Sequence, residues 1–209
     1  MLVSAILPTR ARSYFAHRAL DCVMRQKWPE LEVVILDDLD DLSFPVAPSF
    51  DGVHYHVSEQ RLKTGEKRNR CCELANGQII AHFDDDDYSA PGRIEDQMDR
   101  LMSTGAMLTG YNQMVFEEDT GECWQFTSRD PRFAIGTSMM YRREFWQRHP
   151  FRPLLAGEDS IFLGHAQREN SVVCAPAGQM MLARIHAGNT VTKRPDARSG
   201  WQRIERKAS

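Results

Sequence analysis

The sequence predicts one α/β domain with a mostly parallel central sheet flanked by helices and a small antiparallel region. Through the first hundred residues, short apolar runs alternate with segments whose apolar residues recur at helical spacing. Polar clusters follow several of these runs directly, as they do at the carboxyl ends of parallel strands. Beyond residue 107, two strand patterns flank a turn, which indicates an antiparallel pair. A chain of 209 residues is long enough for one such domain.

Four apolar runs in the first half of the chain predict buried strands. They cover residues 2–7, 31–36, 53–57 and 78–83. The first run is closed by Pro8, and the second stops at Asp37 and Asp38. Strands at this spacing, with helices between them, predict a parallel sheet that is covered on both faces.

Three helices are expected among these strands. The second covers residues 65–75 with Thr64 as its candidate N-cap, and the third is expected to have Pro91 in its first turn. The residues expected to share a buried face are Phe15, Ala19, Cys22 and Val23 in the first helix, and Ile94, Met98, Leu101 and Met102 in the third.

The second half of the chain has a different pattern. Residues 107–116 and 122–127 predict an antiparallel pair around a turn, and residues 172–174 and 180–185 predict the last strands. Short helices are expected over 142–148 and from 157 onward. The tail over 191–209 is polar and basic. Three interpretations of it stay open: a solvated helix, a contact for an anionic partner, and a disordered end.

Composition limits the classes of function. The chain is 42% hydrophobic and 26% charged with a net charge of −3, which gives no reason to expect polyanion binding by the fold as a whole. No run of 18 apolar residues predicts a membrane helix. The start lacks a basic region and is expected to form a strand instead of a signal peptide. The five cysteines lack C-x-x-C spacing, so they predict reduced thiols in a cytoplasmic protein.

Four consecutive aspartates, Asp84 to Asp87, follow the fourth apolar run. Two like charges at about 4 Å repel by roughly 1 kcal/mol even in water, and by more near a protein surface. Such a cluster at a strand end favours a bound cation, and carboxylate oxygens suit Mg²⁺ or Mn²⁺. In an extended chain, Asp84 and Asp86 would point to one side, and Asp85 and Asp87 to the other. The alternative is a solvated acidic loop.

Polar clusters end three of the predicted parallel strands. They are Pro8-Thr9-Arg10, Asp37-Asp38 and the run of four aspartates. Ligands of α/β sheets lie beyond the carboxyl ends of the strands, so these clusters are expected to converge on one rim. The sequence therefore predicts a ligand site there.

Several motifs in order along the chain carry a family resemblance. They are 3–9 (Val-Ser-Ala-Ile-Leu-Pro-Thr), 26–29 (Gln-Lys-Trp-Pro), 32–38 with its final Asp pair, 67–70 (Lys-Arg-Asn-Arg), 77–87 with the four aspartates, 136–144, 157–159 (Gly-Glu-Asp) and 184–186 (Arg-Ile-His). This set resembles the inverting family 2 glycosyltransferases, which have the nucleotide-sugar-binding GT-A fold. The resemblance implies one domain over 1–190, with a nucleotide-binding half over 1–105 and an acceptor-binding half over 106–190.

The resemblance also implies roles for the acidic residues. Asp86 is expected to bind Mn²⁺ or Mg²⁺, with Asp84 toward the metal or the ribose and Asp85 in support. His186 would add a nitrogen ligand, although a structural histidine at a strand end is the alternative. The other six histidines are interpreted as structural.

The resemblance also implies which residues take part in catalysis and in donor binding. Asp159 is the expected general base, near the positive end of a helix dipole, and Glu158 would orient it or the acceptor. The alternative is an acidic pair that only favours the helix dipole. Arg68 is expected near the donor phosphates or on the helix surface.

The remaining donor contacts are expected at the ends of the first two strands. Asp38 should contact the base or ribose, with Asp37 as a substitute, unless Asp38 only forms a turn. Pro8, Thr9 and Arg10 complete the nucleotide-sugar site. Arg10 replaces a frequent Tyr of the family, so a cation–π or phosphate contact is expected there. Leu39 replaces a small or polar residue.

The implied reaction is transfer of a sugar from a nucleoside diphosphate sugar to an acceptor hydroxyl. UDP-sugar is the expected donor, with GDP and dTDP donors open. The acceptor is a glycan, a lipid-linked precursor, a protein or, through the basic tail, a nucleic acid. Two other functions stay open: an inactive module that binds a nucleotide sugar or divalent cation, and a nucleotidyltransferase, although no glycine-rich phosphate loop is evident.

Overall fold

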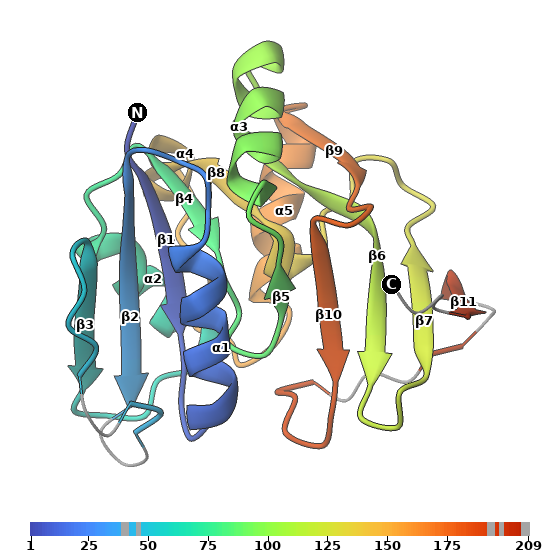
Figure 1. Cartoon of the computed structure of the whole chain (residues 1–209). Coiled ribbons are helices and arrows are strands. Elements are labelled where there is room, and N and C mark those ends of the chain that lie inside the picture. Colours follow the sequence, from blue (N-terminus) through green and yellow to red (C-terminus); the bar gives the residue numbers. More distant parts are fainter. Residues whose placement is uncertain (39–41, 45–46, 192–194, 197–198, 206–209) are drawn as a thin grey trace.

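The fold comes from a computed structural model that describes residues 1–38, 42–44, 47–191, 195–196 and 199–205. Its N-terminal half contains four parallel strands in the order β3-β2-β1-β4 (Figure 1). Their bounds are Val3–Pro8 for β1, Leu31–Asp38 for β2, Val53–Ser58 for β3 and Ile79–His82 for β4. The four predicted strands are therefore confirmed.

Five α-helices flank the sheet in the described part of the chain. Their bounds are Ser13–Met24 for α1, Thr64–Leu74 for α2, Arg93–Thr104 for α3, Arg143–Arg148 for α4 and Glu158–Arg168 for α5. Buried side chains of α1 and α3 pack on one face of the sheet, and those of α2, α4 and α5 pack on the other. Figure 1 shows α1 in front of the sheet and α2 behind it.

Side-chain alternation along the strands divides the core into these two layers. In β2, Val33 and Ile35 belong to the cluster under α1 and α3, while Val34 and Leu36 belong to the cluster under α2, α4 and α5. Both faces are apolar because helices cover both, as expected for parallel strands. The near-continuous hydrophobic runs of the sequence follow from this double burial.

Two details of the predicted helices are wrong. Met102 is 53% exposed, because it lies one position past the buried stripe of Ile94, Met98 and Leu101. Thr64 is the first helical residue instead of the N-cap, which is Lys63.

The second half of the sheet is built around one long strand, β6 (Leu108–Glu118), on the right of Figure 1. It pairs antiparallel with β7 (Cys123–Thr127) and β8 (Met140–Arg142), and parallel with β9 (Val172–Pro176) and β10 (Met181–Ile185). The predicted hairpin is β6 and β7. The two-residue strand β5 (Tyr88–Ser89) pairs with β10 and had no signal in the sequence.

Part of the basic tail joins the sheet. Residues Trp201–Ile204 form β11, which pairs antiparallel with β7. The helix interpretation is therefore wrong for these four residues. Other basic residues of the tail lie outside the described residues: Lys193, Arg194, Arg198, Arg206 and Lys207. Leu39, after β2, also lies outside them. All five cysteines are free thiols. Among the described residues, no helix is long and apolar enough to cross a membrane.

Candidate functional site

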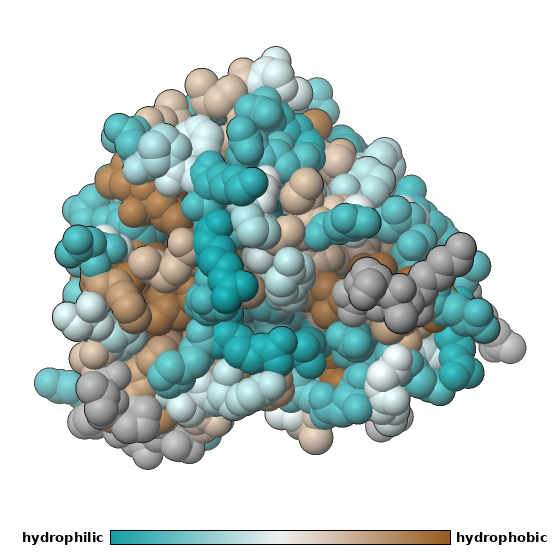
Figure 2. All heavy atoms as spheres, viewed as in Figure 1, coloured by the Kyte–Doolittle hydropathy of each residue, from teal (hydrophilic) through white to brown (hydrophobic). Residues whose placement is uncertain are grey.

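Polar side chains gather where β1, β2 and β4 end and where α5 begins. The buried ones include Thr9 after β1, Asp38 at the end of β2, Asp85 after β4 and Glu158 at the start of α5. Figure 2 shows hydrophilic residues along the middle of the viewed face, between the positions of α1 and β10 in Figure 1. The predicted convergence of the strand-end clusters on one rim agrees with this arrangement.

The four aspartates form a turn instead of an extended strand. Strand β4 ends at His82, and the backbone N–H of Asp87 donates to the carbonyl of Asp84 at 3.4 Å. The predicted alternation of side chains is therefore wrong, because it requires extended backbone. In the turn, Asp85 and Asp86 both face the guanidinium of Arg12.

Asp85 is the buried member of the turn. Its carboxylate accepts hydrogen bonds from Arg12 at 2.7 Å and from the Thr9 hydroxyl at 2.8 Å. Burial raises the pKa of Asp85 to about 6, and the neighbouring Asp86 adds to this effect, although Arg12 opposes it. The Thr9 hydroxyl also lies 2.7 Å from that of Ser43. Thr9 thus holds the acidic turn against the end of β1.

Asp86 contacts three different donors through one oxygen, Oδ2. They are Arg12 at 2.9 Å, His186 Nε2 at 3.1 Å and Asn189 Nδ2 at 3.1 Å. His186 comes directly after β10, so the tertiary structure brings together two residues that lie 100 positions apart. The expected pairing of Asp86 with His186 is thus present in the geometry.

Asp84 faces the opposite direction, toward Arg68 on α2. The Arg68 guanidinium lies 3.3 Å from Asp84 and 2.5 Å from Glu158. Burial opposes the positive charge of Arg68, but the two carboxylates outweigh it and raise the pKa of Arg68. Burial also raises the pKa of Glu158, against the effect of Arg68. Arg68 is 4% exposed, so the interpretation as a surface arginine is wrong.

Asp159 lies half-buried in the first turn of α5, against Gly136. A Cβ atom added to Gly136 would come within 2.0 Å of Asp159 Oδ2, so the carboxylate occupies the space that a side chain would fill. The backbone N–H of Ser160 donates to Asp159 Oδ1 at 2.7 Å. The backbone at the start of the 3-10 helix η1 (Gly136–Ser138) thereby sets where this carboxylate can lie.

His82 fixes the backbone of Gly136 through a hydrogen bond. Its Nδ1 donates to the Gly136 carbonyl at 2.9 Å, and its Nε2 pairs with the Tyr141 hydroxyl at 3.1 Å. Burial lowers the pKa of His82 to about 3, so the ring is neutral at physiological pH. His82 is a structural residue, as predicted, and it positions Gly136 against Asp159.

We expect Gly136→Ala to lower turnover on the order of 10²-fold, because the new methyl group displaces the Asp159 carboxylate by an ångström or more. Stability should change little, since Gly136 does not have a positive φ and the clash is mainly with a rotatable side chain. Turnover is measured as release of the nucleoside diphosphate from the sugar nucleotide.

A matched control is Gly164→Ala on α5. A Cβ there would meet only the Arg168 guanidinium, at 3.4 Å, so turnover should be unchanged. Stability should rise by up to about 1 kcal/mol from helix propensity. Equal turnover in the Gly136→Ala variant and the wild type would contradict a catalytic role for the Asp159 carboxylate.

Asp38 is the most unusual charge on the rim. It is fully buried and forms an ion pair with the Lys67 ammonium, 2.8 Å from Oδ2, while Arg10 Nε lies at 3.8 Å. Among the described residues, no hydrogen bond of good geometry reaches either of its oxygens. Lys67 itself donates to the Thr9 carbonyl at 2.8 Å. An unsatisfied buried carboxylate is costly unless a ligand completes its hydrogen bonds.

Asp37 has a structural role. It accepts hydrogen bonds from the backbone of Asp38, Ser43 and Phe44 and from the Tyr55 hydroxyl. The alternative role expected for Asp38, forming a turn, therefore belongs to Asp37. Because its carboxylate is engaged in these hydrogen bonds, Asp37 cannot replace Asp38 as a contact for the nucleotide. Its hydrogen bonds hold the backbone of Ser43 and Phe44 against the end of β2.

Two basic residues of the site, Arg12 and Lys67, were missed in the sequence. A signal for Lys67 was present: Cys71 and Cys72 lie four residues after Lys67 and Arg68, so the apolar pair and the basic pair share one helix face. All four residues are buried. Arg12 had no such signal, because it lies in a short loop before α1.

Asp86 and His186 are the residues of the rim that could bind a divalent cation together. Asp86 and His186 supply an oxygen and a nitrogen ligand that already lie close together, and Mg²⁺ or Mn²⁺ is often held by one or two carboxylates plus substrate phosphates. No three His, Cys, Asp or Glu side chains of the described residues form a ligand set. Asp84 points to Arg68 instead. The residues fit a cation site that the substrate would complete.

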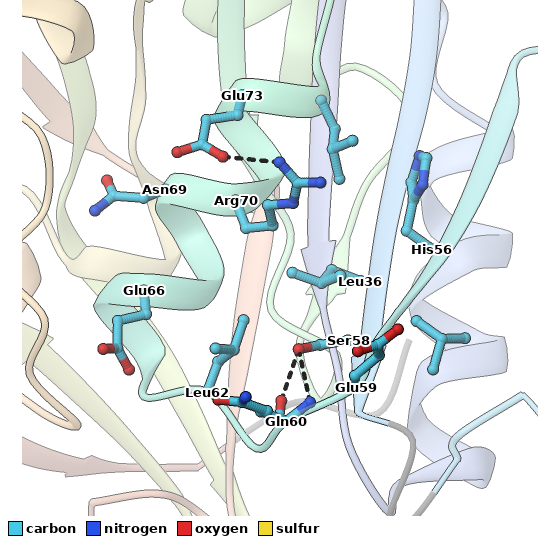
Figure 3. A pocket seen from close by; sticks show the side chains of 12 residues that line it. Leu36, His56, Ser58, Glu59, Gln60, Leu62, Glu66, Asn69, Arg70 and Glu73 are labelled. Atoms are coloured by element: carbon cyan, nitrogen blue, oxygen red, sulfur yellow. Dashed lines mark hydrogen bonds and ion pairs between the residues drawn. The ribbon is translucent and has the colours of Figure 1, made fainter.

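A separate hollow of about 670 Å³ lies between β3 and α2 (Figure 3). Among its lining residues, Arg70 pairs with Glu73, and Ser58 closes a turn with Gln60. It contains none of the rim aspartates. We place the candidate site on the rim, where the buried and unsatisfied charges are.

Comparisons with known proteins agree on one family. The family model described as glycosyl transferase family 2 matches residues 4–157. The uncharacterized glycosyltransferase YibD of Escherichia coli (strain K12) is 26% identical over 138 residues, which are 64% of this chain and 40% of YibD. The chain spans less than half the length of the curated relatives it matches.

Solved structures share the fold. S. aureus TarS 1–349 in complex with UDP-GlcNAc matches with a TM-score of 0.69 and 18% identity, over 91% of this chain and 60% of TarS. The mannosyltransferase PcManGT from Pyrobaculum calidifontis, in complex with GDP-Man and Mn²⁺, matches with a TM-score of 0.67 and 14% identity, over 90% of this chain and 58% of PcManGT. The expected GT-A type α/β fold is confirmed.

Proposed function

The chain belongs to glycosyl transferase family 2, and from this premise we propose that it transfers a sugar, with inversion, from a nucleoside diphosphate sugar to an acceptor hydroxyl. The observation that supports this most is the position of Arg68. Its guanidinium contacts Asp84 in the acidic turn and Glu158 beside Asp159. The buried guanidinium of Arg68 therefore links the acidic turn, where the donor would bind, to the start of α5, which carries the proposed base Asp159.

The nucleotide would bind at the ends of β1 and β2. Asp38 can accept hydrogen bonds from a base N–H or a ribose hydroxyl, which would add to its ion pair with Lys67 the hydrogen bonds that its carboxylate lacks among the described residues. Pro8 at the end of β1 and Thr9 directly after it would adjoin the nucleotide, and Arg10 supplies a partly exposed positive charge. These contacts would orient the diphosphate toward the acidic turn.

Asp86 and His186 would hold Mn²⁺ or Mg²⁺ at that turn. A divalent cation in this position neutralises charge that develops on the leaving diphosphate. Asp85 supports the turn through Thr9, and Asp84 does so through Arg68. These contacts fix the turn before any substrate binds, which is the condition for electrostatic preorganisation.

Asp159 would take the proton from the acceptor hydroxyl as that oxygen attacks the anomeric carbon. A positioned carboxylate contributes about 10²–10⁴-fold to such a step. Glu158 does not face the acceptor in this assignment. It is 3% exposed and bound to Arg68, so we assign it as a positioning residue that fixes the start of α5.

UDP-sugar remains the proposed donor class. TarS is seen with UDP-GlcNAc and PcManGT with GDP-Man, so uridine and guanosine donors both occur on this fold. The acceptor is proposed to be a glycan, a lipid-linked precursor or a protein. An inactive nucleotide-sugar or cation-binding module is the second candidate, because it needs the acidic turn but not Asp159.

Thermal melting with UDP, GDP, ADP, CDP and dTDP, each with and without Mn²⁺, tests the donor site. A ligand at 100 times its Kd adds about 2.7 kcal/mol, which corresponds to roughly 5–10 °C for a chain of this size. We expect one nucleotide to raise the Tm in a Mn²⁺-dependent manner. Asp86→Ala should remove the Mn²⁺-dependent part of that shift.

The control for this experiment is Asp99→Ala, which removes an exposed carboxylate on α3 and should leave the shift intact. An unchanged shift in Asp86→Ala would contradict the cation assignment alone. No shift with any of the five nucleotides would contradict the proposed donor site.

A further inference from the structure

Asp86 Oδ2, the oxygen that faces the second proposed ligand His186, already has three hydrogen-bond partners in the protein. It receives Arg12, His186 Nε2 and Asn189 Nδ2 within 3.1 Å. The side chain of Asp86 is only 10% exposed. The hollow next to Asp86 measures about 20 Å³, which is about the space of one water molecule. A cation can reach this oxygen only if some of these contacts separate.

The hydrogen bonds of His186 point to the same conclusion. The backbone N–H of Gly188 donates to His186 Nδ1 at 3.0 Å, so Nδ1 is an acceptor and Nε2 carries the hydrogen that faces Asp86. A histidine that binds a metal through Nε2 needs its lone pair there and its hydrogen on Nδ1. The observed bond from Gly188 is incompatible with that tautomer.

Arg12 contributes to both features that oppose cation binding, the occupied oxygen of Asp86 and the tautomer of His186. Besides Asp85 and Asp86, its guanidinium donates to the carbonyl of Gly188, the residue whose N–H occupies His186 Nδ1. Asn189 also contacts Asp86. One side chain therefore covers the oxygen of Asp86 that faces His186, and it holds the backbone of 186–189 in the arrangement that keeps a hydrogen on His186 Nε2.

We propose that Arg12 is a built-in competitor of the divalent cation, and that it keeps segment 186–189 latched over Asp86 until cation and diphosphate displace it. The inference rests on the proposed function, because it takes Asp86 and His186 as the cation ligands. Release of Arg12 frees the Gly188 backbone, and His186 can then present Nε2 to the cation. In the free enzyme, Arg12 thus offsets part of the negative charge of Asp85 and Asp86 without a metal.

The test is the affinity for Mn²⁺ alone, measured by electron paramagnetic resonance of free Mn²⁺ without nucleotide. Arg12→Gln should bind Mn²⁺ about tenfold more tightly than the wild type, a gain of about 1.4 kcal/mol. Arg12→Lys keeps the charge but cannot span Asp85, Asp86 and Gly188 together, so it should also bind more tightly, by a smaller factor. Unchanged or weaker binding in both variants would overturn the proposal.

The control variant is Arg25→Gln at the end of α1, which removes the same charge from an exposed pair with Asp21 and should not change the Kd for Mn²⁺. Hydrogen exchange supplies a second readout. Amides of 186–190 should exchange faster in Arg12→Gln, and equal protection in Arg12→Gln and wild type would also overturn the latch.

The outcomes separate this inference from the proposed function. If no protein in the series binds Mn²⁺ while sugar transfer proceeds in EDTA, the competition is wrong and the transferase assignment stands. If Mn²⁺ binds as predicted but no sugar nucleotide is consumed, the latch stands and the proposed reaction falls.

Discussion

Asp159→Asn is expected to lower the turnover of the sugar nucleotide by about 10²–10⁴-fold while its Kd for the nucleoside diphosphate stays within a factor of about two. The amide keeps the shape of the side chain against Gly136 and can still accept the hydrogen bond from Ser160. It cannot take a proton from an acceptor hydroxyl. Single-turnover release of the nucleoside diphosphate measures the chemical step, and thermal melting measures the binding.

The control for this substitution is Asp99→Asn on the exposed side of α3, which should match the wild type in both measurements. Full turnover in Asp159→Asn would remove Asp159 from the role of base. Loss of nucleotide binding in the same variant would instead indicate that Asp159 belongs to the donor site.

Arg68→Gln is expected to destabilise the fold by about 3–5 kcal/mol, because it leaves Glu158 buried without a counter-charge. For a chain of this size, that loss corresponds to a fall in Tm of roughly 6–20 °C. Asp84, which is 31% exposed, can recover solvent and should contribute less. Denaturant unfolding measures the free energy, with the midpoint compared at constant slope.

A double variant separates the charge effect from lost packing. Arg68→Gln combined with Glu158→Gln removes both partners of the buried pair, so it should recover part of the lost stability. Arg70→Gln on the same helix breaks only the exposed pair with Glu73 and should cost about 0.5 kcal/mol or less. Equal destabilisation by Arg68→Gln and Arg70→Gln would contradict the buried ion pair.

Much of the fold could be predicted because its strands are buried on both faces. Such strands appear as uninterrupted apolar runs, and the runs at 2–7, 31–36 and 78–83 coincide closely with β1, β2 and β4. The hairpin of β6 and β7 was also evident from two patterns around a turn. The strands β5 and β11 were missed. Strand β5 has only two residues, and β11 (Trp-Gln-Arg-Ile) has polar residues at its centre instead of an apolar run.

Two predictions at the site were wrong because neighbouring residues alone do not determine the backbone conformation. The alternation of the aspartates assumed extended backbone, but the chain turns at Asp85 and Asp86. Asp37 and Asp38 could not be distinguished by type, because both end the same strand. Only the backbone of Ser43 and Phe44, folded over Asp37, made one a turn former and left the other unsatisfied.

The sequence by itself determined the α/β class, the positions of the first strands along the chain and the position of the acidic cluster, because these depend on periodicity and on adjacent residues. The tertiary structure decided which charges meet. His186 reaches Asp86 across 100 residues, Arg68 reaches Glu158 across 90, and Arg12 reaches Gly188 across 176. No local pattern encodes such pairs, since they form only when separate strand ends are brought to one rim.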